Sequence, residues 1–164
     1  MQTNITTERL LLNIITEEDH DFMQELMNTE GWIQFIGDRS IHSREAAIAY
    51  INTINARPNF YYWLVRLKET HRPVGIITFI KRDYLDHFDI GFAFLPGYNG
   101  KGYAYEAARE VLSLVKLQAE HQVVQATTLP ENVRSIKLLN KLGLHFTGNI
   151  MVGKNELSLY STDI

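Results

Sequence analysis

Residues 97–110 read GYNGKGYAYEAARE, a glycine-rich turn that runs directly into a strongly periodic helix. Three glycines, Gly97, Gly100 and Gly102, fall within six residues. Apolar residues then recur at helical spacing as far as Val115. The residues before the turn, FDIGFAFL at 88–95, have the composition of a strand. The stretch therefore predicts a strand, a turn with unusual backbone freedom, and a helix.

A junction of this kind is suited to binding an anion. The first N–H groups of a helix lack partners inside the helix, and the helix dipole favours negative charge there. Glycines let the backbone approach an oxygen atom closely, and Lys101 adds a cation. The same glycines would also suit a tight connection without a ligand, so the turn alone leaves both interpretations open. Its spacing does not match a nucleotide P-loop, and a dinucleotide fingerprint fits poorly.

The rest of the pattern predicts one mixed α/β domain over residues 1–164, without repeats or linkers. The element order is β-α-α-β-β-β-α-β-α-β-β, with about seven strands in a mostly antiparallel sheet and four helices. We expect strands at 9–15, 60–67, 74–81, 88–95, 121–128, 145–152 and 156–162, and helices after Thr16, after Ser43, behind the glycine turn and over 130–144. Residues 32–41 are expected to form a loop or a short irregular helix.

Composition narrows the classes of function. The chain has 164 residues, a formal net charge of −3 and no cysteine. The lack of cysteine rules out disulfides, thiolate metal ligands and a cysteine nucleophile. The charge balance opposes nucleic-acid binding, and no apolar run approaches the roughly 20 residues that cross a bilayer. We expect a cytoplasmic protein, monomeric or homodimeric, without nucleic-acid or membrane partners.

The second strong helix, over 130–144, also carries polar residues of interest. Asn132 lies at its start and Ser135 one turn later. Asn132 could simply cap the helix, and Ser135 could be a small packing residue. Both would nevertheless lie near the glycine turn, because the strand before this helix is expected beside it. Two polar groups beside a phosphate cradle suggest a long phosphorylated cofactor.

With these two helices and this element order, the chain resembles the GNAT superfamily of acetyl-CoA-dependent N-acetyltransferases, and more narrowly its RimJ/RimL-type branch. The resemblance extends from TERLLLNII to ELSLYST, and YEAAREVL resembles the TEAA continuation of that branch. The family motif Q/R-x-x-G-x-G/A falls on Asn99, Gly100, Lys101, Gly102, Tyr103 and Ala104. The motif Asn-x-x-Ser/Ala ending in Lys-x-Gly-Phe falls on Asn132, Ser135, Lys141, Gly143 and Leu144.

The resemblance implies a single GNAT domain with acetyl-CoA as co-substrate and no metal. The third strand of the meander would diverge from the next parallel strand and leave a wedge for the cofactor. Pantetheine would bind along this strand, at Phe92, Ala93, Phe94 and Leu95, and the pyrophosphate would bind N–H groups of residues 100–105. Asn132 would contact the pantetheine or thioester region. Lys141 would contact the outer phosphates, or else is a solvated helix lysine. Asn99 stands where the family usually has Gln or Arg, so the resemblance does not establish whether Asn99 makes the usual contact with the pyrophosphate.

The implied chemistry is direct attack of an amine on the acetyl carbonyl. Leu139 stands where many members have a tyrosine acid, so Ser135 is the candidate that protonates the leaving thiolate. A backbone N–H near Phe92 or Ala93 would polarise the carbonyl. Asp89 is the candidate general base, with a structural salt bridge or the cap of a turn as the alternative.

The acceptor pocket is the least defined part of the implied site. By resemblance its wall includes residues 30–42, and its candidate residues are Trp32, Asp38, His42, Asp83 and Tyr84. Nearby acids favour a cationic acceptor, either a protein N-terminus or a small-molecule amine. The alternative function is a non-catalytic acyl-CoA-binding module of the same fold.

Overall fold

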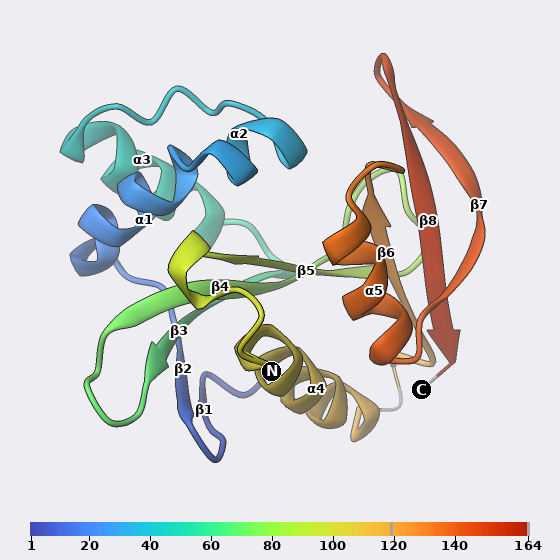
Figure 1. Ribbon diagram of the computed structural model, residues 1–164, viewed down its shortest axis with the longest axis horizontal. Coiled ribbons are helices and arrows are strands. Elements are labelled where there is room, and N and C mark those ends of the chain that lie inside the picture. Colours follow the sequence, from blue (N-terminus) through green and yellow to red (C-terminus); the bar gives the residue numbers. More distant parts are fainter. Residues whose placement is uncertain (119, 164) are drawn as a thin grey trace.

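The computed structural model describes residues 1–118 and 120–163 and shows a single mixed sheet with helices on both faces (Figure 1). The strands are β1 (Asn4–Thr6), β2 (Leu10–Ile14), β3 (Phe60–Leu67), β4 (Pro73–Ile80), β5 (Phe88–Phe94), β6 (Val123–Thr128), β7 (His145–Val152) and β8 (Asn155–Asp163). The helices are α1 (His20–Met27), α2 (Glu30–Phe35), α3 (Arg44–Asn55), α4 (Tyr103–Lys116) and α5 (Val133–Lys141), with short 3-10 turns at Glu17–Asp19 and Pro96–Tyr98.

The sheet has the order β1-β2-β3-β4-β5-β6-β8-β7. The first five strands form an antiparallel meander, β5 and β6 are parallel, and β6, β8 and β7 are antiparallel. The prediction of a mixed, mostly antiparallel sheet is therefore confirmed. The strand count is corrected to eight, because β1 has three residues, too few to show an alternating pattern.

The helix count is also corrected, because residues 30–35 form α2, which overlaps the start of the region 32–41 expected to be loop or short irregular helix. Thr29 caps this helix by accepting a hydrogen bond from the Trp32 N–H. Ser43 caps α3 as predicted, accepting from the N–H of Ala46 at 3.1 Å. No helix in the described part of the chain is long and apolar enough to cross a membrane.

Two apolar clusters fix the helices to opposite faces of the sheet. One cluster joins α1, α2 and α3 to side chains such as Leu64 and Ile76. The other joins α4 to Trp63, Ile77 and Ile90, and includes Leu139 of α5. Because side chains alternate along a strand, neighbouring residues of β5 belong to different clusters. Phe92 and Phe94 pack on the α4 side, and Ala93 on the α3 side.

The two parallel strands separate soon after they meet. Only Phe88 with Val124 and Asp89 with Gln125 pair between β5 and β6. Beyond these pairs the strands run apart, and Figure 1 shows β5 crossing the molecule while β6 turns toward α5. The wedge expected from the family resemblance is therefore present, and the edge of β5 that faces it carries no strand.

Candidate active site

The open edge of β5 presents backbone hydrogen-bonding groups to the wedge. The N–H of Leu95 donates to the carbonyl of Val74 at 2.9 Å, and Phe94 lies opposite Gly75. In an antiparallel pair the residues alternate between bonding the partner strand and pointing away from it. The groups of Ala93 and Leu95 thus face β4, whereas those of Phe92 and Phe94 face the wedge. Of the two N–H groups considered for polarising the acetyl carbonyl, that of Phe92 has the suitable direction.

The glycine turn has the form of an anion cradle. Gly100 and Gly102 adopt positive φ angles of 76° and 82°, and Gly102 is the N-cap residue of α4. The N–H groups of residues 100–105 have no backbone hydrogen-bond partner among the described residues. A Cβ built on Gly100 would meet nothing within 4 Å, so the space above this peptide is open. Free donors, a helix dipole and open space together fit a pyrophosphate group.

The other residues of the first motif surround this cradle. Asn99 is half-buried, and its N–H donates to the carbonyl of Pro96 at 3.3 Å. Lys101 is exposed, with its ammonium 5.7 Å from the centre of the Tyr98 ring. The ring of Tyr103 packs under the guanidinium of Arg9 at 4.5 Å. Lys101 is therefore placed to add charge at the cradle, and the Tyr103 ring packs the start of α4 against Arg9.

Asn132 is the N-cap residue of α5. Its Oδ1 accepts a hydrogen bond from the N–H of Ser135 at 3.2 Å. The capping interpretation is thus correct, but it uses only the oxygen of the amide, and the Nδ2 donor is not needed for the cap. Ser135 is half-buried on the first turn of the same helix, which lies beside β6 at the wedge (Figure 1).

Asp89 lies at the point where β5 and β6 separate. It is 3% exposed, and its Oδ2 accepts from Arg82 Nε at 2.6 Å while its Oδ1 accepts from the Thr127 N–H at 3.3 Å. Burial raises the pKa of Asp89, and the neighbouring Arg82 acts in the opposite direction. The carboxylate therefore bridges the two diverging strands. This arrangement is the structural salt bridge considered as the alternative to a general base.

Tyr84, an acceptor candidate from the sequence, lies near Asp89, and Tyr62 and Tyr50, which sequence reasoning did not select, pack on the α3 face. Tyr84 is 44% exposed and hydrogen-bonds to Thr127, and burial raises its pKa. Tyr62 is buried with its phenol near that of Tyr50, and burial raises its pKa also. The cation of Arg39 acts on the phenols of both Tyr62 and Tyr84. Only the folded protein reveals this group, because its residues come from five separate segments: the loop before α3, α3, β3, the turn before β5, and β6.

The predicted acceptor residues do not form one cluster. Trp32 is 5% exposed and belongs to the core beneath α1 and α3. His42 is exposed and lines a shallow surface groove with α1 residues such as Asp21. Asp38 accepts the N–H of Ser40 at 2.8 Å in the exposed loop before α3. Asp83 is exposed beside Tyr84, so these two residues lie on the same turn as Arg82.

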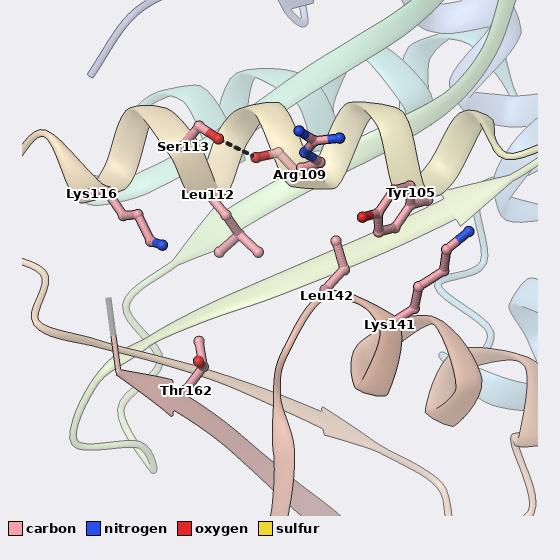
Figure 2. Close-up of a pocket in the computed structure, with 8 residues that line it drawn as sticks. All are labelled: Tyr105, Arg109, Leu112, Ser113, Lys116, Lys141, Leu142 and Thr162. Carbon is pink, nitrogen blue, oxygen red and sulfur yellow. Dashed lines mark hydrogen bonds between the residues drawn. The ribbon is translucent and has the colours of Figure 1, made fainter.

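A basic pocket of about 250 Å³ lies between α4, α5 and the end of β8 (Figure 2). Its described lining contains three cations, Arg109, Lys116 and Lys141, and no carboxylate. Tyr105 and Lys141 form one end of the pocket, with the Lys141 ammonium 4.2 Å from the centre of the Tyr105 ring. This end adjoins the first turn of α4. Lys141 therefore lies near the cradle, in a setting that attracts anions.

The wedge, the cradle and the capped helix α5 are the features that the resemblance to acetyltransferases implied. The chain belongs to the GNAT family, because the family model described as "Acetyltransferase (GNAT) domain" matches residues 9–145. It is 31% identical over 146 residues to the "Uncharacterized N-acetyltransferase YnaD" of Bacillus subtilis, and the match covers 88% of this chain and 84% of that protein.

Solved structures show the same fold. An acetyltransferase of the GNAT family from Bacillus anthracis has a TM-score of 0.82 at 25% identity, over 98% of both chains. A RimL ribosomal L7/L12 alpha-N-protein acetyltransferase, solved with coenzyme A, has a TM-score of 0.84 at 12% identity, again over 98% of both chains. The protein is thus an N-acetyltransferase by family, acetyl-CoA is its co-substrate, and the predicted family and fold are confirmed.

Proposed function

We propose that this enzyme transfers the acetyl group of acetyl-CoA directly to a primary amine, either a protein N-terminus or a small molecule. The observation that carries the proposal is the unpaired edge of β5 leading to the cradle at the start of α4. An extended ligand can add to such an edge as an extra strand. The same edge ends at donors suited to a pyrophosphate, so one long ligand can use both.

The proposed cofactor contacts are made by the hydrogen-bonding groups that line the wedge and the cradle. The backbone of Phe92 and Phe94 would bind the pantetheine arm, and the Nδ2 of Asn132 would donate to it from the opposite side of the wedge. The N–H groups of residues 100–105 would bind the pyrophosphate, with the Asn99 amide and Lys101 nearby. The basic pocket with Lys141 would attract the outer phosphates, and its Tyr105 ring offers a flat apolar surface to a base.

The reaction needs an activated acyl group, an oxyanion donor and an acid for the leaving group. Acetyl-CoA supplies the activated acyl group as a thioester. The N–H of Phe92 would donate to the carbonyl oxygen as negative charge develops on it. The Ser135 hydroxyl would relay a proton to the departing thiolate, since Leu139 carries no titratable group, and the proton that the attacking nitrogen loses would replace it through solvent.

The acceptor amine must arrive without its proton. An α-amine with a pKa near 8 is roughly one-tenth neutral at pH 7, whereas a lysine with a pKa near 10.4 is only about 0.04% neutral. Asp89 is the predicted general base, but both its oxygens already accept hydrogen bonds. We propose that Asp89 mainly holds the vertex of the wedge, and that the enzyme prefers α-amines because they need little help to lose a proton.

Release of free thiol from acetyl-CoA tests the function. The panel contains peptides with varied N-termini, free amino acids, polyamines and aminoglycosides. We expect release that requires one class of acceptor and collapses in Ser135→Ala. Coenzyme A binding without release for any acceptor would favour the non-catalytic binding module, and no binding of coenzyme A would overturn the proposal.

The variant Asp89→Asn distinguishes a structural role of Asp89 from a role as general base, and it keeps an oxygen to accept from the Thr127 N–H. If Asp89 holds the wedge, the variant loses stability and coenzyme A affinity, because Arg82 keeps a half-buried charge without its partner. A general base would instead give a variant with intact affinity, a large loss of kcat and a missing acid limb in the pH–rate profile.

A further inference from the structure

The turn between β1 and β2 reaches the glycine cradle through one side chain. Arg9 is 44% exposed, yet its guanidinium makes directed contacts on three sides. Its Nε donates to Glu106 Oε2 at 2.7 Å, and its Nη1 donates to the Lys101 carbonyl at 3.0 Å. Its flat face covers the Tyr103 ring at 4.5 Å. The cradle and the first turn of α4 are thus attached to the N-terminal hairpin.

The contact with the Lys101 carbonyl sets the direction of the next N–H group. In a trans peptide the C=O and the following N–H point to opposite sides, and the described chain has no cis peptide bonds. Because the Lys101 oxygen is bonded to Arg9, the Gly102 N–H points away from Arg9. That N–H has no backbone partner among the described residues, so it remains free to donate to an anion.

Glu106 holds Arg9 in this position. Its Oε1 accepts from the Thr7 hydroxyl at 2.6 Å and from the Arg9 N–H at 2.8 Å, while its Oε2 binds the guanidinium. The guanidinium also lies against Gly102, since a Cβ built there would be 3.3 Å from Arg9 Nη2. Gly102 is therefore constrained both by its positive φ and by the space that Arg9 occupies.

We infer that Arg9 is a positioning residue for the cofactor: by holding the Lys101 carbonyl it turns the Gly102 N–H toward the pyrophosphate. The inference rests on acetyl-CoA binding at the cradle. It concerns only the pyrophosphate end of the ligand, because the open edge of β5 and Asn132 lie on other elements. Loss of Arg9 should therefore affect ligands that contain a pyrophosphate and spare those that lack it.

The test compares coenzyme A with pantetheine, which has the same arm but no pyrophosphate or nucleotide. Dissociation constants are measured for the wild type, Arg9→Gln and Arg9→Lys, with calorimetry for coenzyme A and NMR titration for pantetheine. Arg57→Gln is the control, because it removes the same charge from an exposed residue that stacks on Phe60 beyond the end of α3. Circular dichroism and thermal melting confirm that each variant is folded.

A hydrogen bond to a charged group contributes enough binding free energy that Arg9→Gln should lower the affinity for coenzyme A roughly ten- to one-hundredfold. The affinity of Arg9→Gln for pantetheine should change less than twofold. Arg57→Gln should change the affinity for neither ligand. Arg9→Lys should lie between, because an ammonium keeps the charge but cannot donate in two fixed directions. The protection from amide exchange that coenzyme A gives to the Gly102 N–H should be smaller in Arg9→Gln than in the wild type, which a purely global effect would not confine to this loop.

If Arg9→Gln lost equal affinity for both ligands, or kept its affinity for coenzyme A, the positioning role of Arg9 would be overturned and the cofactor site would stand. A wild-type protein that binds pantetheine but gains nothing from the pyrophosphate would overturn this role as well. Failure of the wild type to bind coenzyme A would overturn the cofactor site itself, and so is distinguishable from failure of the Arg9 inference.

Discussion

The three glycines of the turn should respond differently to the same substitution. Gly102 has a φ of 82°, and a side chain in this left-handed region costs about 1–2 kcal/mol. A Cβ there would also lie 3.3 Å from Arg9 Nη2, which Glu106 holds in place. Gly97 is outside the left-handed region and a Cβ would meet nothing within 4 Å. Gly102→Ala should therefore be costly and Gly97→Ala nearly neutral.

The cost of Gly102→Ala can appear in two places. If the turn keeps its shape, the free energy of unfolding falls by about 1–2 kcal/mol. If the turn relaxes instead, the same energy is lost from coenzyme A binding, and the dissociation constant rises roughly 5- to 30-fold. Gly100→Ala, with a φ of 76° and open space around the Cβ, should show the backbone cost without the Arg9 clash.

Urea denaturation and calorimetric titration measure the two quantities. The sum of the two losses for Gly102→Ala should exceed that for Gly97→Ala by at least about 1 kcal/mol. Gly97→Ala should stay within about 0.5 kcal/mol of the wild type. If Gly102→Ala matched Gly97→Ala in both stability and affinity, the description of the cradle as a strained, ligand-binding turn would be refuted.

Four further substitutions, at Ser135, Asn132 and Glu106, test the separate roles assigned to these residues. Ser135→Ala should lower kcat roughly 100-fold or more in steady-state assays, with coenzyme A affinity unchanged, because the Asn132 cap binds the Ser135 N–H and not its hydroxyl. Asn132→Ala should lower stability by about 1 kcal/mol, whereas Asn132→Asp should keep the cap but weaken coenzyme A binding in calorimetry, because it removes the Nδ2 donor. Partial burial raises the pKa of Glu106, but the hydrogen bonds from Thr7 and Arg9 outweigh it and hold this pKa below the usual 4.5. Stability from Glu106 is therefore complete above pH 4.5 and lost as the pH falls through the lowered pKa, and melting curves of Glu106→Gln should show a smaller acid dependence than the wild type.

The sequence predicted the elements whose patterns are long. The strand at 60–67, the helix behind the glycine turn and the closing hairpin were visible because each carries many residues of one period. The strand β1 was missed because three residues cannot show alternation. The helix α2 was expected only as an irregular segment, because six residues span less than two turns.

The cofactor side of the site could be predicted because its features are local. The glycines and the cap of Asn132 depend on residues close together in the chain. The acceptor side could not, because Thr127, 38 residues further along the chain, approaches Asp89 only through the pairing of β5 with β6 in the folded sheet. Arg9 was missed for the same reason, since 97 residues separate it from Glu106. Its one signal was a polar pair, Glu8 and Arg9, just before the first apolar run.

Amide hydrogen exchange with and without coenzyme A tests the central claim most directly, because the cofactor is proposed to bind through backbone N–H groups. Protection is measured residue by residue by NMR. We predict that coenzyme A protects the N–H groups of residues 100–105 together with those of Phe92 and Phe94, and leaves the exposed edge of β7 unchanged. Protection that is absent from residues 100–105 while coenzyme A is bound would contradict the claim that this turn holds the pyrophosphate.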